Sequence, residues 1–346
     1  MSALPDTRDR GGPNQPLLIV TSLRKYFPIR GGLLNRQVAS VQAVDDVSFS
    51  VRKGETLGIV GESGCGKSTT ARLLMRLIEP DVGQVVFDGE AVGAQDGISV
   101  RDLRRSMQMV FQDSYASLNP RLPIESSISF GQRFQGIGKV EAAARSRDLL
   151  ARVGLEPNRF AQRYPHELSG GQRQRVNIAR ALALDPRLLI LDEAVSALDK
   201  SVEAQVLNLL ADLKAAFDLT YIFISHDLNV VRYISDRVMV MYLGKVVEIG
   251  PVDQVYANPR HPYTSALLSA MPSMDPDHRT EQPPLTGDPP NPINPPSGCR
   301  FRTRCAFAED VCAVAPALTA LDPADEHAVS CHRETAGSGH SGAPAS

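Results

Sequence analysis

The sequence has few cysteines, no long apolar run and almost no net charge. It contains five cysteines in 346 residues, and 37 Lys and Arg residues nearly balance 39 Asp and Glu residues, giving a formal net charge of −2. No apolar run approaches the roughly 20 residues that a helix needs to span a bilayer. The near-neutral charge gives no reason to expect nucleic acid as the partner. Residues 1–16 lack the apolar core of a secretory signal, so we expect a disordered leader on a cytosolic chain.

Short apolar runs alternate with amphipathic stretches, which predicts an α/β domain with a largely parallel sheet. Two runs, "ETLGIV" from Glu55 and "LLILDE" ending at Glu193, are candidates for buried strands. A helix is predicted from Lys67 to Pro80, and its apolar stripe consists of Leu73, Leu74, Leu77 and Ile78. The pattern is mostly helical between about 113 and 168.

The chain changes character after Met271. Nine prolines between Pro272 and Pro296 predict an extended linker over 271–298. Four of the five cysteines follow, in what we call the cysteine-bearing segment, 299–333. A small-residue tail, 334–346, is expected to be disordered.

The stretch "GESGCGKST" matches the phosphate-binding pattern G-x-x-x-x-G-K-[ST], between a predicted strand and a predicted helix. Its glycines let backbone N–H groups turn toward phosphate oxygens, and the start of the helix adds positive potential. Lys67 is expected to reach the β- and γ-phosphates of a nucleotide, and Ser68 to bind Mg²⁺. The phosphate-binding loop consists of Gly61, Glu62, Ser63, Gly64, Cys65, Gly66, Lys67, Ser68 and Thr69.

Two adjacent carboxylates at the end of "LLILDE" supply a second part of the predicted site. Asp192 can hold Mg²⁺ through water, and Glu193 can polarise the water that attacks the γ-phosphate, acting as a general base. The alternative, an acidic pair on the surface after a core strand, is less compatible with the phosphate-binding loop upstream.

The stretch "LSGGQRQRV" separates this chain from other nucleotide-binding classes. It contains a second anion-binding start of a helix, formed by Ser169, Gly170, Gly171 and Gln172. One chain does not need two anion-binding helix starts for one phosphate. Two copies arranged head to tail do need both, because the second helix start of one copy closes over the nucleotide held by the other. These motifs together resemble the ATP-binding cassette family over roughly residues 17–270. The resemblance implies a P-loop NTPase fold with a RecA-like core, an antiparallel β-subdomain, an α-helical subdomain and a small C-terminal Cys-containing region.

The same resemblance assigns further residues. Gln112 in "MVFQD" matches the glutamine that senses Mg²⁺ and the attacking water, and His226 in "FISHD" matches the histidine that contacts the γ-phosphate. Asp199 in "SALD" lies in the loop that crosses the dimer interface of family members. Phe27, or alternatively Tyr26, is expected to stack on adenine. With Glu193 and His226 present, the chain is expected to hydrolyse ATP.

The stretches "FQDSYASLNPRLPI" and "NPRHPYTSALLSAMP", with the cysteine-bearing segment, look like those of oligopeptide/dipeptide importer ATPases, most like the second ATPase subunit of that system. This implies two membrane permease subunits, a paired ATPase and an extracytoplasmic solute-binding protein as partners, on the cytoplasmic face of the inner membrane. Glutathione, nickel-chelate and oligosaccharide importers use similar subunits, so the substrate stays open. A soluble cassette protein acting on ribosomes or nucleic acid is the rival class.

The cysteines at the end of the chain have gaps of five, six and eighteen residues, and they are Cys299, Cys305, Cys312 and Cys331. Structural disulfides are disfavoured in the cytosol, and the gaps do not match the usual C-x₂₋₄-C zinc pattern. A [4Fe–4S] cluster, which some peptide-importer ATPases hold in such a tail, zinc, and unligated thiols remain as alternatives, and His332 could replace one cysteine. Arg300, Arg302 and Arg304 are expected to offset the charge of a thiolate-bound cluster.

Overall fold

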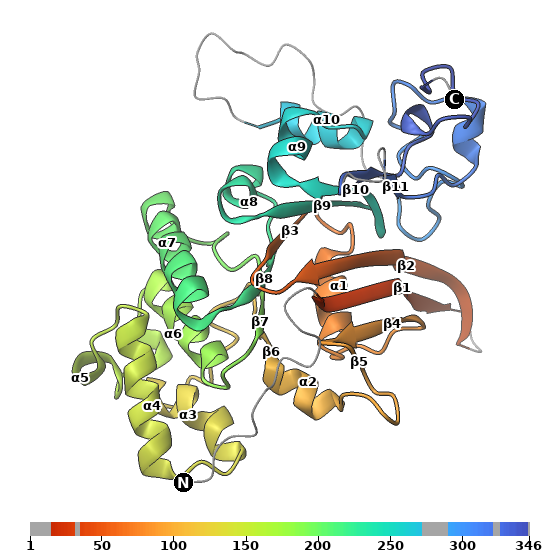
Figure 1. Cartoon of the computed structure of the whole chain (residues 1–346). Coiled ribbons are helices and arrows are strands. Elements are labelled where there is room, and N and C mark those ends of the chain that lie inside the picture. The colour runs from red at the N-terminus through yellow and green to blue at the C-terminus, as the bar shows by residue number, and fades with distance from the viewer. Residues whose placement is uncertain (1–14, 32–34, 272–289, 321–325, 345–346) are drawn as a thin grey trace. The chain divides into compact units, whose positions relative to one another are not determined.

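The computed structural model describes residues 15–31, 35–271, 290–320 and 326–344. The chain divides into two compact units, each assembled from separate segments (Figure 1). The first unit comprises Met1–Leu18, Val51–Thr56 and Val86–Ile224, and the second comprises Ile19–Ser50, Leu57–Val85 and Ser225–Ser346. Residues 1–14 of the predicted leader and 272–289 of the predicted linker lie outside the described residues.

Parallel strands form the sheet of the first unit. In this sheet β7 (Leu188–Asp192) lies between β6 (Met107–Val110) and β8 (Thr220–Ile224). Every residue of β7 and β8 is buried, as expected for parallel strands that are covered on both faces. The carboxyl ends of parallel neighbours meet at one edge of a sheet, so the residues that follow β6 and β7 come together.

The rest of the first unit is mainly helical. Within the region 113–168 lie α3 (Ile124–Phe134) and α4 (Lys139–Arg152), which pack against each other and against α6 (Gly170–Leu182) (Figure 1). The elements of this unit outside the sheet of β6–β8 are β5 (Glu90–Ala91), α2 (Val100–Ser106), α3 (Ile124–Phe134), α4 (Lys139–Arg152), α5 (Pro157–Phe160), a 3₁₀ turn (Pro165–Glu167), α6 (Gly170–Leu182) and α7 (Lys200–Phe217).

In the second unit, β3 (Thr56–Val60) pairs in parallel with β9 (Arg237–Tyr242). A hairpin at Leu243 and Gly244 connects β9 to antiparallel β10 (Lys245–Pro251), and these two residues have φ of 43° and 82°. The cysteine-bearing segment extends this ladder: β12 (Ala328–Val329) pairs with β10, and β11 (Thr319–Ala320) pairs with β12. The segment is thereby part of the second unit.

A second ladder of this unit places β1 (Pro16–Gly31) between β2 (Arg36–Arg52) and β4 (Val82–Phe87). The helical elements of the unit are α1 (Lys67–Leu74), α8 (Leu228–Ile234), α9 (Val252–Ala257), α10 (Pro262–Ser269) and 3₁₀ turns at Asp310–Ala313 and His332–Glu334. No helix within the described residues is both long and apolar enough to span a bilayer.

Two expectations differ from the structure. Helix α1 stops at Leu74 instead of reaching Pro80, because Arg76 adopts a left-handed φ of 53°, and Leu77 is consequently 47% exposed instead of lying on the apolar stripe. The tail was expected to be disordered, yet residues 334–344 fold back. His340 is buried, and its Nε2 hydrogen-bonds to the Phe307 carbonyl oxygen at 2.8 Å, which ties the tail to the cysteine-bearing segment.

Candidate functional site

The phosphate-binding loop has the glycine conformations that its sequence predicts. Buried strand β3 leads into it, and Gly66, with φ of 107°, caps the start of α1. A β-carbon at Gly66 would clash with the carbonyl oxygen of Ala43, and one at Gly61 with that of Met241. Only glycine therefore fits at these two positions, where the backbone turns sharply and neighbouring chain lies close.

Lys67 is held inside the loop. Its side chain is buried, and Nζ donates hydrogen bonds to the carbonyl oxygens of Gly61 at 2.7 Å and Glu62 at 3.1 Å. Burial raises the pKa of the neighbouring Cys65 thiol, although Lys67 acts in the opposite direction. Cys65 is thus a small packed side chain and not an activated thiol.

Gln112 and Glu193 come together in the first unit. Gln112 follows β6 and Glu193 follows β7, and the Gln112 amide nitrogen donates a hydrogen bond of 2.7 Å to the Glu193 carboxylate. Glu193 has a left-handed φ of 48°, uncommon for a residue other than glycine. Asp192, the last residue of β7, is buried. Two predicted catalytic residues, 81 apart in the chain, therefore share one hydrogen bond.

The "LSGGQ" stretch begins α6 with a capping box. The Gln172 N–H donates to the Ser169 hydroxyl at 3.3 Å, and the Ser169 N–H donates to the Gln172 side chain at 3.0 Å. Gly171 packs so closely on Val202 of α7 that a β-carbon there would clash with it. Ser169 is exposed, so this helix start is accessible to another molecule. Asp199, which precedes α7, is exposed as well.

The remaining predicted nucleotide contacts belong to the second unit, as the phosphate-binding loop does. His226 follows β8 and is exposed, and Asp227 beside it caps α8. The Tyr26 hydroxyl donates to Asp45 at 2.6 Å. Phe27 is 36% exposed, with the Lys25 ammonium 5.8 Å from its ring centroid. The tyrosine is engaged within the fold, whereas the phenylalanine presents its ring to the outside, which favours Phe27 as the stacking residue.

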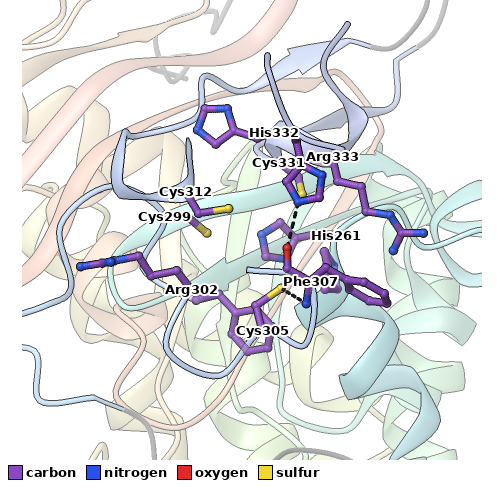
Figure 2. A pocket seen from close by; sticks show the side chains of 12 residues that line it. His261, Cys299, Arg302, Cys305, Phe307, Cys312, Cys331, His332 and Arg333 are labelled. Carbon is purple, nitrogen blue, oxygen red and sulfur yellow. Dashed lines mark hydrogen bonds between the residues drawn. The ribbon is translucent and has the colours of Figure 1, made fainter. Parts of the chain in front are cut away.

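All four cysteines of the cysteine-bearing segment line one pocket (Figure 2). Three of them accept a hydrogen bond from the backbone N–H two residues onward, among them Cys305 from Phe307 at 3.4 Å. Burial raises the pKa of Cys299 and Cys331 to about 11 each. The thiols are thus arranged around a shared space, with N–H groups directed at sulfur, and a positive charge inside that space would favour their thiolate forms.

Within the described residues the cysteines form no disulfide, and no group of three His, Cys, Asp or Glu side chains is arranged to hold a single metal ion.

Arg302 lines the pocket, together with Arg333. The expected role of the other two arginines is wrong. Arg300 binds the Leu243 carbonyl oxygen and, at 2.6 Å, Asp45, whereas Arg304 binds Glu62. Neither lines the pocket of the cysteines, because the irregular backbone there turns them toward β9, β10 and the phosphate-binding loop.

Comparison with known proteins adds two family matches. Residues 44–196 match the family model "ABC transporter", and residues 247–312 match "Oligopeptide/dipeptide transporter, C-terminal region". The "Probable peptide ABC transporter ATP-binding protein y4tS" of Sinorhizobium fredii is 52% identical over 91% of this chain and 89% of its own length. The "Oligopeptide transport ATP-binding protein AppF" of Bacillus subtilis is 51% identical over 92% of this chain and 97% of its own. The chain belongs to the ABC transporter ATPases.

Solved structures agree with this assignment. The cassette cbiO1 of Clostridium perfringens, part of an ABC transporter complex, has a TM-score of 0.61 at 28% identity, over 71% of this chain and 92% of its own. A dimeric ATP-binding cassette in a post-hydrolysis state, bound to ADP and Pi, has a TM-score of 0.58 at 27% identity, over 68% of this chain and 98% of its own. These cassettes confirm the predicted fold class, and the family is one of ATP-hydrolysing enzymes.

Several contacts that shape the site had no signal in the sequence. Arg304 contacts Glu62, which is 242 residues away in the chain. The Tyr263 hydroxyl accepts a hydrogen bond of 2.8 Å from the Glu62 N–H. Arg304 and Tyr263 belong to no nucleotide-binding motif, and a single sequence cannot reveal contacts between residues so far apart in the chain.

Proposed function

We propose that this chain is the ATP-hydrolysing subunit of a peptide importer. The observation that carries the proposal is the match of residues 247–312 to the C-terminal region of oligopeptide/dipeptide transporters, on a chain that also matches the ABC transporter model. Relatives named for peptide transport are 51–52% identical over more than 90% of the chain. Peptide import accounts for both parts of the sequence, the cassette and the cysteine-bearing segment.

In the proposed hydrolysis, ATP binds with its phosphates on the phosphate-binding loop, where Lys67 exchanges its bonds to loop carbonyl oxygens for bonds to the β- and γ-phosphates. Ser68, Asp192 and Gln112 would hold Mg²⁺, which when bound would supply positive charge near the transferring phosphoryl group. Glu193 accepts a proton from the attacking water. The Gln112 amide, which donates to Glu193, orients that carboxylate.

Two chains form the complete site in this proposal. The exposed start of α6, with Ser169, Gly170, Gly171 and Gln172, closes over the γ-phosphate held by the partner chain. Asp199 lies at the same interface, His226 contacts the γ-phosphate, and Phe27 stacks on adenine. Whether the paired ATPase is a second copy or a different chain does not alter these roles.

The proposed partners are two membrane permease subunits, reached through residues 113–124. Backbone N–H groups of Tyr115 and Ala116 both donate to the Asp113 carboxylate at 2.9 Å, and Asn177 of α6 donates to the Ser114 carbonyl oxygen at 2.9 Å. The loop is thus held in a defined shape, and Tyr115 is 50% exposed. Docking here would place the chain peripherally on the cytoplasmic face of the inner membrane, with a solute-binding protein on the far side.

Purification of the tagged chain from detergent-solubilised membranes tests this function. We expect two permease subunits and an ATPase to copurify, and we expect cells that lack the chain to lose uptake of labelled peptides. If the cells instead lose uptake of glutathione, a nickel chelate or an oligosaccharide, the chain belongs to an importer of that substrate and not of peptides. Copurified ribosomes or DNA in place of permeases would overturn it.

We also propose that the four cysteines hold a [4Fe–4S] cluster. What supports the proposal is a pocket lined by all four thiols, with backbone N–H groups donating to the sulfurs of Cys299, Cys305 and Cys331. A cluster bonds each cysteine to a different iron, so its ligands surround a volume and do not converge on a point. Bound there, it would join the turns of the segment into one rigid piece.

Anaerobic purification provides the test of the cluster. We expect brown absorbance, about four irons per chain and matching acid-labile sulfide. The Cys312→Ser variant should lose most of the iron, because a buried ligand is removed. Cys65→Ser is the matched control: its thiol lies in the phosphate-binding loop, so the iron content should stay at the wild-type value. A colourless protein with one zinc per chain would show that the cysteines bind zinc and not a cluster. A metal-free protein would refute both the cluster and the zinc site.

A further inference from the structure

We propose that Arg304, supplied by the cysteine-bearing segment, is a positioning residue of the phosphate-binding loop, and that it keeps Lys67 available to ATP by holding Glu62. The inference rests on the proposed role of this loop in ATP binding, and goes beyond it by making the segment part of the nucleotide site.

Arg304 and Glu62 form a two-point ion pair. The Arg304 Nη1 lies 2.9 Å from one Glu62 carboxylate oxygen, and Nη2 lies 3.2 Å from the other. The side chains are 5% and 24% exposed, respectively. The Tyr242 hydroxyl accepts a further bond from Nη1 at 3.3 Å, and the guanidinium lies 5.9 Å from the centroid of that ring. Paired donors in a fixed fork set the orientation of a carboxylate, which a flexible single-point contact does not.

Glu62 distributes this constraint within the loop. Its carboxylate binds Arg304, its N–H donates to the Tyr263 hydroxyl at 2.8 Å, and its carbonyl oxygen accepts from Lys67 at 3.1 Å. One residue thus connects the cysteine-bearing segment to the ammonium group that is expected to bind phosphate. A change in the orientation of Glu62 necessarily changes the surroundings of Lys67.

Two neighbours of Arg304 anchor the segment beside the loop. The buried ring of Phe301 lies 5.3 Å from the ring of Tyr242 and 5.4 Å from that of Tyr263, centroid to centroid. Arg300 donates to the carbonyl oxygen of Leu243, and the next residue, Gly244, donates its N–H to the Cys65 carbonyl oxygen at 2.8 Å. The segment therefore reaches the phosphate-binding loop through Phe301 and Arg300 as well as through Arg304, and it is Arg304 that brings a positive charge to the Glu62 carboxylate.

Electrostatics explain why the loop needs this arginine. A carboxylate on a loop that binds triphosphate repels the ligand unless a cation compensates it. Without Arg304, the Glu62 carboxylate can turn toward the Lys67 ammonium, which already contacts the backbone of the same residue. That new pair would compete with ATP phosphates for Lys67, so binding of ATP should weaken while the chemical step is little affected.

The Arg304→Ala variant of the full-length chain tests the inference by titration with a fluorescent ATP analogue. We expect the dissociation constant to rise about tenfold. The double variant Arg304→Ala with Glu62→Ala should recover to within about threefold of wild type, because the uncompensated carboxylate has been removed. In steady-state hydrolysis by the assembled transporter, the single variant should raise KM and leave kcat nearly unchanged.

Arg260→Ala is the matched control, since Arg260 pairs at 3.3 Å with Glu334, the residue that directly follows the segment, and makes no contact with the loop within the described residues. Its ATP affinity should equal that of wild type. Wild-type affinity in Arg304→Ala would overturn the inference, and so would a double variant as weak as the single one, since loosened packing of the segment would then be the cause. Failure of the wild-type chain to bind the analogue would instead refute the proposed nucleotide site.

Discussion

Replacement of Glu193 by glutamine should lower kcat for ATP hydrolysis by about 10²–10⁴-fold and leave ATP affinity within a few-fold of wild type. The amide has nearly the shape of the carboxylate and retains an oxygen that can accept the 2.7 Å hydrogen bond from Gln112. It cannot accept a proton from the attacking water, however. Binding depends on the phosphate-binding loop, which the substitution leaves intact, so ATP should accumulate in a closed dimer.

Turnover and nucleotide occupancy should be measured together on the chain purified with its permease partners. Glu141→Gln serves as the control, because Glu141 pairs with Arg145 on the exposed face of α4 and a neutral amide there should leave turnover unchanged. A Glu193→Gln variant that hydrolyses ATP at a rate within a few-fold of wild type would falsify the assignment of Glu193 as the base. Loss of ATP binding in that variant would argue for a role in assembling the site.

The strands and most of the helices could be predicted because their patterns are local. Runs such as "LLILDE" are apolar throughout, and buried parallel strands require such runs. The end of α1 could not be predicted, since the chain leaves the helix through a left-handed residue that is arginine and not glycine. Nothing in the composition around Arg76 marks such a turn.

The candidate site divides in the same way. The order of the motifs pointed to Gln112 and Glu193 separately. The hydrogen bond between them depends on β6 and β7 being neighbours in the sheet, and neither motif predicts the order of the strands. The arginines among the cysteines show the converse problem. Three alternate positions carry the same residue type, yet Arg302 lines the pocket while Arg304 pairs with Glu62. In an irregular segment no periodicity relates residue spacing to side-chain direction, so composition alone suggested one shared role.

The largest effect on ATP binding is expected from Gly66→Ala. Gly66 has a φ of 107°, which is unfavourable for a residue with a side chain, and its β-carbon would clash with the Ala43 carbonyl oxygen. The loop cannot relieve that clash without moving the start of α1, from which Lys67 and Ser68 project. Strain of about 3 kcal/mol corresponds to a loss of affinity of roughly 100-fold or more. Titration with a fluorescent ATP analogue measures this loss.

Gly64→Ala separates steric from conformational strain, because the two glycines belong to the same loop and both have positive φ. Gly64 has a φ of 79°, and no heavy atom outside its chain neighbours lies within 4 Å of a β-carbon built there. The substitution therefore costs only the left-handed conformation, about 1–2 kcal/mol, and affinity should fall about tenfold. Equal losses in the two variants would show that backbone conformation alone, and not the approach of Ala43, requires glycine at Gly66. If both variants unfold cooperatively on heating, each is folded. A much larger loss of ATP affinity in Gly66→Ala would then establish that close contact with Ala43 of β2 fixes the shape of the phosphate-binding loop.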